Sequence, residues 1–201
     1  MSPQQPQPQP PPPRHSATVI EFDRVADGTV VDTHYNGVVF GSVTDTRPIP
    51  RPPHTGPTAL GHVFARFSPS AESPPNVVSV IAPSFPPAFD IRSGAIQATF
   101  TSPQQYVSID AKPIWSSDAT SNPVNKPYLQ AFGQDGRIMY TAVYSDQTFL
   151  SWQSLIVSSP APDIYTVVFS CQHQDTASVY GLFDRLVFSD RLPLILPVIA
   201  E

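Results

Sequence analysis

The chain has few of the residues that give many small domains their stability or their chemistry. It contains one cysteine among 201 residues, so it can form neither an internal disulfide nor a cysteine-only metal site. Charged residues make up 13% of the chain, its net charge is -5, and its 11 basic residues are scattered. Because no basic cluster could neutralise several phosphates at once, we expect no nucleic-acid partner.

Catalytic and metal-binding motifs are missing as well. The sequence has no Gly-x-Ser-x-Gly, no glycine-rich phosphate loop, and no His-x-His or His-Glu-x-x-His spacing. Cys171 is in phase with Val167 and Phe169, which indicates a small core hydrophobe rather than a nucleophile. A pair of acids on facing strands would suffice for glycoside hydrolysis. The aspartates that could supply it mostly stand beside turns, where solvated side chains are normal: Asp110, Asp118, Asp135, Asp146 and Asp163.

Long apolar runs are also missing. The most apolar stretch, residues 192–200, is about half the length of a membrane span and holds two prolines. We expect no membrane span, and a tail that packs on the domain or on a partner. The first residues lack a basic n-region and an apolar h-region, so no signal peptide is visible. A cytosolic protein, a trimmed leader and unconventional export all fit this start.

Proline is the residue that the chain has in excess, with 26 copies. Seven prolines and four glutamines fill the first thirteen positions, a composition that predicts disorder or polyproline II. We therefore expect a disordered tail at residues 1–17, one domain at residues 18–189 and an apolar extension at residues 190–201. The length and a hydrophobic fraction of 40% suit a single core.

Short apolar alternation punctuated by turn residues predicts β-structure throughout the domain. Residues 96–100 and 107–111 alternate apolar with polar side chains, so one face of each strand goes to the core. Asp135-Gly136 separates two such runs and is a strong hairpin signal. With no sustained helical period, about ten strands favour an all-β, two-sheet antiparallel β-sandwich of jelly-roll or galactose-binding-like type. Other strand candidates lie at 37–40, 60–67, 77–82, 128–132, 138–144, 149–157, 164–171 and 179–188.

Acidic residues near both ends of the domain suggest a metal site. Asp184 shares strand parity with Leu182 and Leu186, so alternation points it inward, where a carboxylate needs a partner. Glu21 and Asp23 lie on the expected first strand. If the terminal strands are neighbours, these three acids could hold a structural Ca²⁺ together with loop carbonyls. The other interpretation is that Asp184 accepts hydrogen bonds from a turn and the N-terminal acids are solvated.

A polar loop between two strands carries the side chains that sugar sites use. It contains Trp115, Asp118, Asn122 and Asn125. Sugars bind a flat aromatic face with carboxylate or amide groups beside it, so these four are the predicted ligand-binding residues. An ordinary loop whose tryptophan folds back on the core is the open alternative. Trp152 falls within a strand-like run and is expected in the core.

The order of several phrases resembles the β-sandwich domains of exported, PEP-CTERM-type bacterial proteins. The shared phrases are apolar-x-Phe-Asp at 20–23, Gly-Thr-x-Val at 28–31, Tyr-x-Gly-Val-x-Phe at 35–40 and a final strand at 184–188. The resemblance implies an extracellular, carbohydrate-binding-type jelly roll. Arg185 replaces the second acid of the family's Asp-Asp-Leu-x-Phe strand, which removes one cation ligand. The family's Val-Pro-Glu-Pro sorting signal is also missing.

These observations together predict a non-catalytic module that binds carbohydrate or another extracellular ligand. The alternative is a structural or assembly protein whose two tails contact partner chains. A glycosidase or lyase is the least favoured class. The sequence leaves the oligomeric state open.

Overall fold

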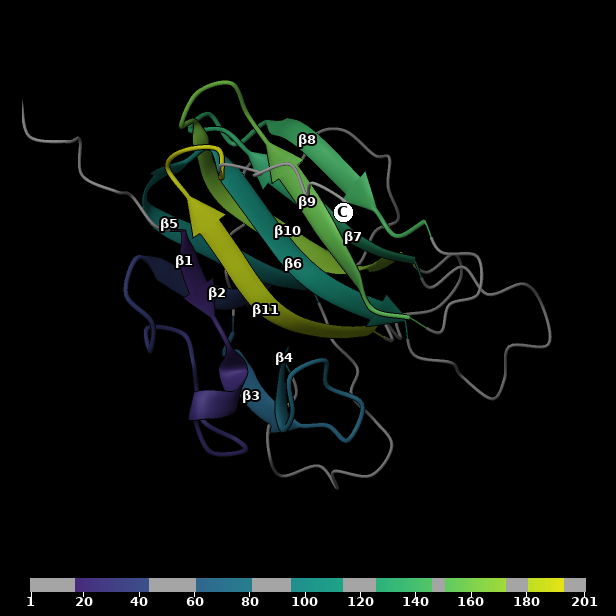
Figure 1. Ribbon diagram of the computed structural model, residues 1–201. Helices are drawn as coiled ribbons and strands as arrows, with labels where there is room; N and C mark the ends of the chain where they lie inside the picture. The colour runs from purple at the N-terminus through teal and green to yellow at the C-terminus, as the bar shows by residue number, and fades with distance from the viewer. Residues whose placement is uncertain are drawn as a thin grey trace, which may run out of the picture.

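The computed structural model describes residues 17–43, 61–80, 95–113, 126–145, 151–172 and 181–193. These segments form two antiparallel sheets that pack face to face, together with the 3-10 helix η1 (Phe22–Arg24) (Figure 1). The all-β sandwich expected from the sequence is therefore confirmed. Across the described segments, no helix has the length and apolar character needed to cross a membrane.

The first sheet is six-stranded and is built around the last strand of the domain. Its path is β3-β4-β11-β6-β9, and β1 also pairs with β11. One edge of β11 therefore faces β6, while the other edge is shared by β1 and β4. The terminal strands are neighbours, as Val19 pairs with Val187. The strand bounds are β1 (Thr18–Ile20), β3 (Phe64–Phe67), β4 (Asn76–Ser79), β6 (Tyr106–Pro113), β9 (Gln153–Ser158) and β11 (Gly181–Ser189).

The second sheet is five-stranded, with the order β2-β5-β10-β7-β8. Its β7–β8 hairpin turns at Gly136, which has a φ of 73°, and Asp135 Oδ1 accepts a hydrogen bond of 3.0 Å from the Arg137 N–H. The hairpin predicted from Asp-Gly is thus confirmed, because glycine tolerates the left-handed backbone. The strand bounds are β2 (Val38–Val43), β5 (Ala95–Gln104), β7 (Lys126–Phe132), β8 (Ile138–Val143) and β10 (Ile164–Gln172).

The core lies between the two sheets and follows the alternation seen in the sequence. Ile96 and Phe100 on β5 and Ile109 on β6 all point into it. Phe169 and Phe183 pack against each other from opposite sheets, with ring centroids 5.1 Å apart. The side chains that alternate with these residues form the outer face of each sheet, and the functional candidates lie there.

Cys171 is buried in this core, as predicted, and burial raises the pKa of its thiol. The sulfur fills the place beside Gly181 that a side chain at that position would need. This close approach couples β10 of one sheet to β11 of the other. Glycine is therefore required at 181 for space, because interiors pack too tightly to accept an added methyl group.

We expect Gly181→Ala to destabilise the domain by about 1–3 kcal/mol, since the new Cβ would overlap the Cys171 sulfur. Cys171→Ala alone should cost about 1 kcal/mol or more through the cavity that it leaves. The double variant should be more stable than the sum of the two losses predicts, because each change accommodates the other. Urea unfolding of the four proteins tests this. Strictly additive losses would contradict the contact.

Candidate functional site

The outer face of the six-stranded sheet is shaped by a β-bulge in β11. Asp184 lies opposite Asp110 on β6 and Leu186 lies opposite Ile109, so Arg185 is the extra residue. Its φ of 40° is in the left-handed region, which is unfavourable for a residue with a Cβ. Because the bulge resets the alternation, Leu186 enters the core while the side chains of Asp184 and Arg185 lie on the outer side of the sheet.

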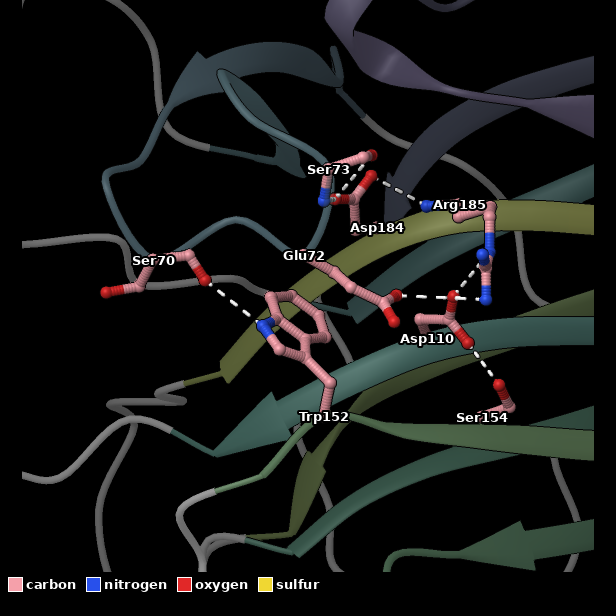
Figure 2. Close-up of polar contacts among 8 residues, drawn as sticks. All are labelled: Ser70, Glu72, Ser73, Asp110, Trp152, Ser154, Asp184 and Arg185. Atoms are coloured by element: carbon pink, nitrogen blue, oxygen red, sulfur yellow. Dashed lines mark hydrogen bonds and ion pairs between the residues drawn. The ribbon is translucent and has the colours of Figure 1, made fainter.

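Asp184 is fully buried, but not in the sandwich core as its parity suggested. The bulge turns it outward, where residues 68–75 lie over it (Figure 2). Its Oδ2 accepts hydrogen bonds from Ser73 N (3.0 Å) and Ser73 Oγ (3.1 Å), and its Oδ1 accepts one from Arg185 N (2.7 Å). Desolvation raises the pKa of this carboxyl, and these hydrogen bonds partly oppose the rise.

Asp110 lies in the middle of β6 and is 3% exposed, so its expected place beside a turn was wrong. The Ser154 hydroxyl on β9 donates a short hydrogen bond to its Oδ1. Its Oδ2 lies 2.7 Å from Arg185 Nε, and this ion pair holds the guanidinium over the sheet. The Arg185 side chain remains 43% exposed. The positive charge of Arg185 therefore reaches solvent while Asp110 holds the side chain in place.

Glu72, in the 68–75 segment, is the fourth charged residue at this place. Its carboxyl faces Asp110, as Figure 2 shows, and lies 3.9 Å from Arg185 Nη2. A hydrogen bond with Asp110, followed by burial, raises the pKa of Glu72 to about 7. We refer to Glu72, Asp110, Asp184 and Arg185 as the acid–arginine cluster.

Trp152 stands beside this cluster rather than in the core, which corrects the sequence expectation. It precedes β9, where it shares the outward parity of Ser154. Its indole N–H donates to the Ser70 carbonyl at 3.2 Å, and the side chain is partly exposed. The ring therefore lies against the 68–75 segment at Ser70 (Figure 2).

An apolar row crosses the same outer face. Val19, Val187, Ser108 and Ile156 pair in register across β1, β11, β6 and β9. Val19 is 52% exposed and Ile156 is 50% exposed. The face thus combines exposed aliphatic surface with a partly exposed indole and a charged cluster.

The acids predicted to bind calcium have other partners. Glu21 pairs with Arg24 at 3.6 Å, and Asp23 accepts a hydrogen bond of 2.7 Å from Asn76 N. Strand β1 ends at Ile20 and Asp23 lies in η1, so neither acid is on the first strand. Within the described segments, no three His, Cys, Asp or Glu side chains are grouped as metal ligands. Calcium binding stays a prediction, which a melting-temperature rise lost in Asp184→Ala would support.

The predicted sugar-binding loop lies outside the described residues, and this includes all four of its predicted ligand-binding residues: Trp115, Asp118, Asn122 and Asn125. Sequence reasoning did not select Glu72, Arg185 or Trp152 for this role. Its one usable signal was Asp110, which alternates with core residues in the middle of a strand and so had to face outward.

A second polar surface lies on the outer face of the five-stranded sheet. Gln97 and Gln130 flank Val168 in register on neighbouring strands. Within the described chain, Gln97 Oε1 and Ser170 Oγ are buried without a hydrogen-bond partner. These residues are at most 9% exposed, so the centre of this face is enclosed. The open face of the six-stranded sheet is therefore the stronger candidate for contact with a ligand.

The strain at the bulge can be measured with two substitutions. Arg185→Gly and Arg185→Ala both remove the guanidinium, but only alanine keeps the penalty of a Cβ at a φ of 40°. We expect the glycine variant to be more stable than the alanine variant by about 1 kcal/mol. Urea midpoints measure the difference. Equal stabilities would show that residue 185 does not need the left-handed backbone.

Comparison with known proteins adds little to this geometry. No family model matches the chain, and no curated protein matches it. Among solved structures, a match is the CBM22-1 xylan-binding domain from Paenibacillus barcinonensis Xyn10C. It is 13% identical with a TM-score of 0.26, over 84% of this chain and 99% of that domain. Since so low a TM-score supports no inference about a site, the resemblance to PEP-CTERM-type domains stays a prediction and the fold rests on its sheet topology.

Proposed function

We propose that this chain is a non-catalytic binding module that holds a neutral saccharide on the outer face of its six-stranded sheet. The observation that carries the proposal is the half-exposed Arg185 guanidinium, fixed by Asp110 beside the partly exposed Trp152. Sugar recognition combines an apolar surface for the ring with directional groups for the hydroxyls. The cluster and the indole supply both on one face.

The charges at this face favour an uncharged ligand. Three acids, Glu72, Asp110 and Asp184, surround the single guanidinium of Arg185. The guanidinium is already paired, so an anionic sugar would meet a surplus of negative charge. Hydroxyl groups can instead donate to the partly exposed carboxyl of Glu72 and accept from the partly exposed guanidinium of Arg185.

The geometry favours binding over hydrolysis. Glycosidases separate their two carboxyls by roughly 5–9.5 Å so that the scissile bond, or the bond and a water, fits between them. Asp110 is occupied by Ser154 and Arg185, and Glu72 lies 3.9 Å from the same guanidinium. Both carboxyls therefore face Arg185, and Asp110 is buried.

A second function, assembly with partner chains, is favoured by the apolar row. Its ends, Val19 and Ile156, expose about half of their surfaces. A partner that covered this row would bury aliphatic area that is now in contact with water. Light scattering across a wide concentration range distinguishes the two functions, because a strict monomer would remove self-assembly.

Binding to a glycan array, followed by titration with the best neutral oligosaccharide, tests the proposal. We expect Arg185→Gly to weaken binding at least about tenfold, which corresponds to about 1.4 kcal/mol. The glycine variant suits this test because it relieves the backbone strain while it removes the guanidinium. Arg137→Gly is the matched control, since Arg137 is exposed in the β7–β8 hairpin, and its affinity should be unchanged.

Two other variants distinguish a wrong position for the site from a wrong function. Gln97→Ala and Gln130→Ala alter the enclosed face of the other sheet and should leave the affinity unchanged. If they abolish binding while Arg185→Gly does not, the sugar binds to the five-stranded sheet, and the proposed site on the six-stranded sheet is wrong. An array without any neutral glycan bound would remove the function itself.

A further inference from the structure

The edges of the two sheets are protected to different degrees. The paths of the sheets end at β3 and β9 in one and at β2 and β8 in the other (Figure 1). On β3, Ala65 N donates to the Thr29 carbonyl at 2.9 Å, and on β2, Ser42 N donates to the Gly61 carbonyl at 2.9 Å. The chain itself therefore satisfies backbone groups on these two outer edges, which keeps them from pairing with another strand.

Strand β9 has an open edge in the part of the chain that the structure describes. It pairs with β6 on one side, and no described strand pairs with its other side. Ser159 continues the register of β9, and its N–H donates to the Gln105 carbonyl at 2.8 Å. Because bonded positions recur at every second residue of an antiparallel pair, the residues between them direct their backbone groups away from β6. Three residues of β9 are of this kind: Ser154, Ile156 and Ser158.

The composition of β9 leaves this edge without protection. Natural edge strands are protected by charged side chains, proline or bulges. Strand β9, Gln153–Ser158, contains no charge and no proline, and its pairing with β6 is regular. Its edge-directed residues are exposed, Ile156 by 50%. By contrast, β8 pairs with β7 across a register shift and begins beside the exposed Arg137. Strand β9 is therefore the edge best suited to accept another strand.

We propose that β9 pairs with β9 of a second copy of this chain, antiparallel and about a two-fold axis at Ile156. In this register Ile156 lies opposite the partner's Ile156, and Ser154 lies opposite the partner's Ser158. Each of the three facing pairs exchanges two backbone hydrogen bonds, so about six bonds join the strands. The facing side chains are neutral, so no like charges meet. The two six-stranded sheets become one continuous sheet.

The apolar row favours a second copy of the chain in this register. The row crosses the sheet in register from Val19 and ends with Ile156 at the open edge. Pairing about Ile156 continues the row directly into the partner and brings two half-exposed isoleucines together. A register shifted by two residues would instead place Ile156 opposite a serine, Ser154 or Ser158.

The charges of the acid–arginine cluster do not oppose this pairing. Asp110 lies opposite Ser154, near one end of β9, and the two-fold axis carries the partner's cluster to the other end. Three strand spacings and four residues then separate the two Asp110 positions, a distance of roughly 20 Å. This distance exceeds the Debye length of about 8 Å at physiological ionic strength, so the clusters are screened from each other. The pairing does not rest on the proposed saccharide site, so a failed glycan array leaves it untouched.

Analytical ultracentrifugation of the full chain, from about 1 μM to about 1 mM, tests the pairing. We expect a monomer–dimer equilibrium. Ile156→Lys places two like charges opposite each other at the axis, so it should raise the dissociation constant at least about tenfold. Val19→Lys is the matched control, because Val19 is 52% exposed at the far end of the same row. It should leave the dissociation constant unchanged.

Two results of this experiment would overturn the proposal. One is a parent protein that stays monomeric over the whole range. The other is an equal effect of Val19→Lys and Ile156→Lys, because the copies would then meet through the face of the sheet rather than through its edge.

A second pair of variants tests the backbone contact itself. Ser158→Pro removes an N–H that is directed away from β6, so the monomer should keep its fold while the dimer loses a donor from each copy. Ser158→Ala keeps the N–H and should dimerise like the parent protein. Melting curves at low concentration show that both variants are folded. Equal dissociation constants for the two folded variants would exclude pairing through this edge.

Cysteine cross-linking tests the register. Ile156→Cys places two thiols opposite each other at the axis, so mild oxidation should give a disulfide-linked dimer. Ser158→Cys should give none, because its neighbour in the partner is Ser154. The native Cys171 is buried and should not react. Cross-linking through position 158 but not through 156 would exclude a two-fold axis at Ile156.

Discussion

The structure depends most on a fully buried carboxylate that has to be satisfied where it lies. Isolated in an apolar interior, the charge of Asp184 would cost several kcal/mol or would be neutralised by a proton. Three donors partly offset this cost, two from Ser73 and one from the backbone of Arg185. Because Ser73 is 111 residues away in sequence, this one side chain fixes a distant loop against the last strand.

The same requirement explains the bulge. A donor from the residue next to Asp184 needs the backbone of β11 to leave its regular ladder, and the bulge at Arg185 provides that departure. The left-handed φ carries a penalty of about 1 kcal/mol. The ion pair with Asp110 and the hydrogen bond to Asp184 offset it. The strained backbone at Arg185, the burial of Asp184 and the ion pair with Asp110 therefore depend on one another. Together they leave the Arg185 guanidinium partly exposed.

The strands could be predicted from sequence because each depends on a local pattern. Alternation in residues 96–100 and 107–111 gave the buried faces, and Asp135-Gly136 gave the hairpin. Asp184 was predicted to be buried and in need of a partner, but its direction was wrong because one extra residue in β11 cannot be seen without the register of β6. The position of Glu72 could not be predicted from the sequence for a similar reason. It lies in a loop whose position is set by Ser73 and Trp152, which are contacts between distant segments.

The proposed binding site coincides with a stabilising network on one of the two outer faces of the sandwich. On the five-stranded sheet, polar groups such as Gln97 are enclosed. On the six-stranded sheet, the polar groups are tied to one another, and only their outer atoms reach solvent. A ligand that meets Arg185 or Glu72 therefore meets groups already held in place, so little conformational entropy is lost on binding. The same ties mean that most substitutions there alter stability and binding together. Glycine at 185 is the exception, because it removes the proposed ligand contact while it relaxes the backbone.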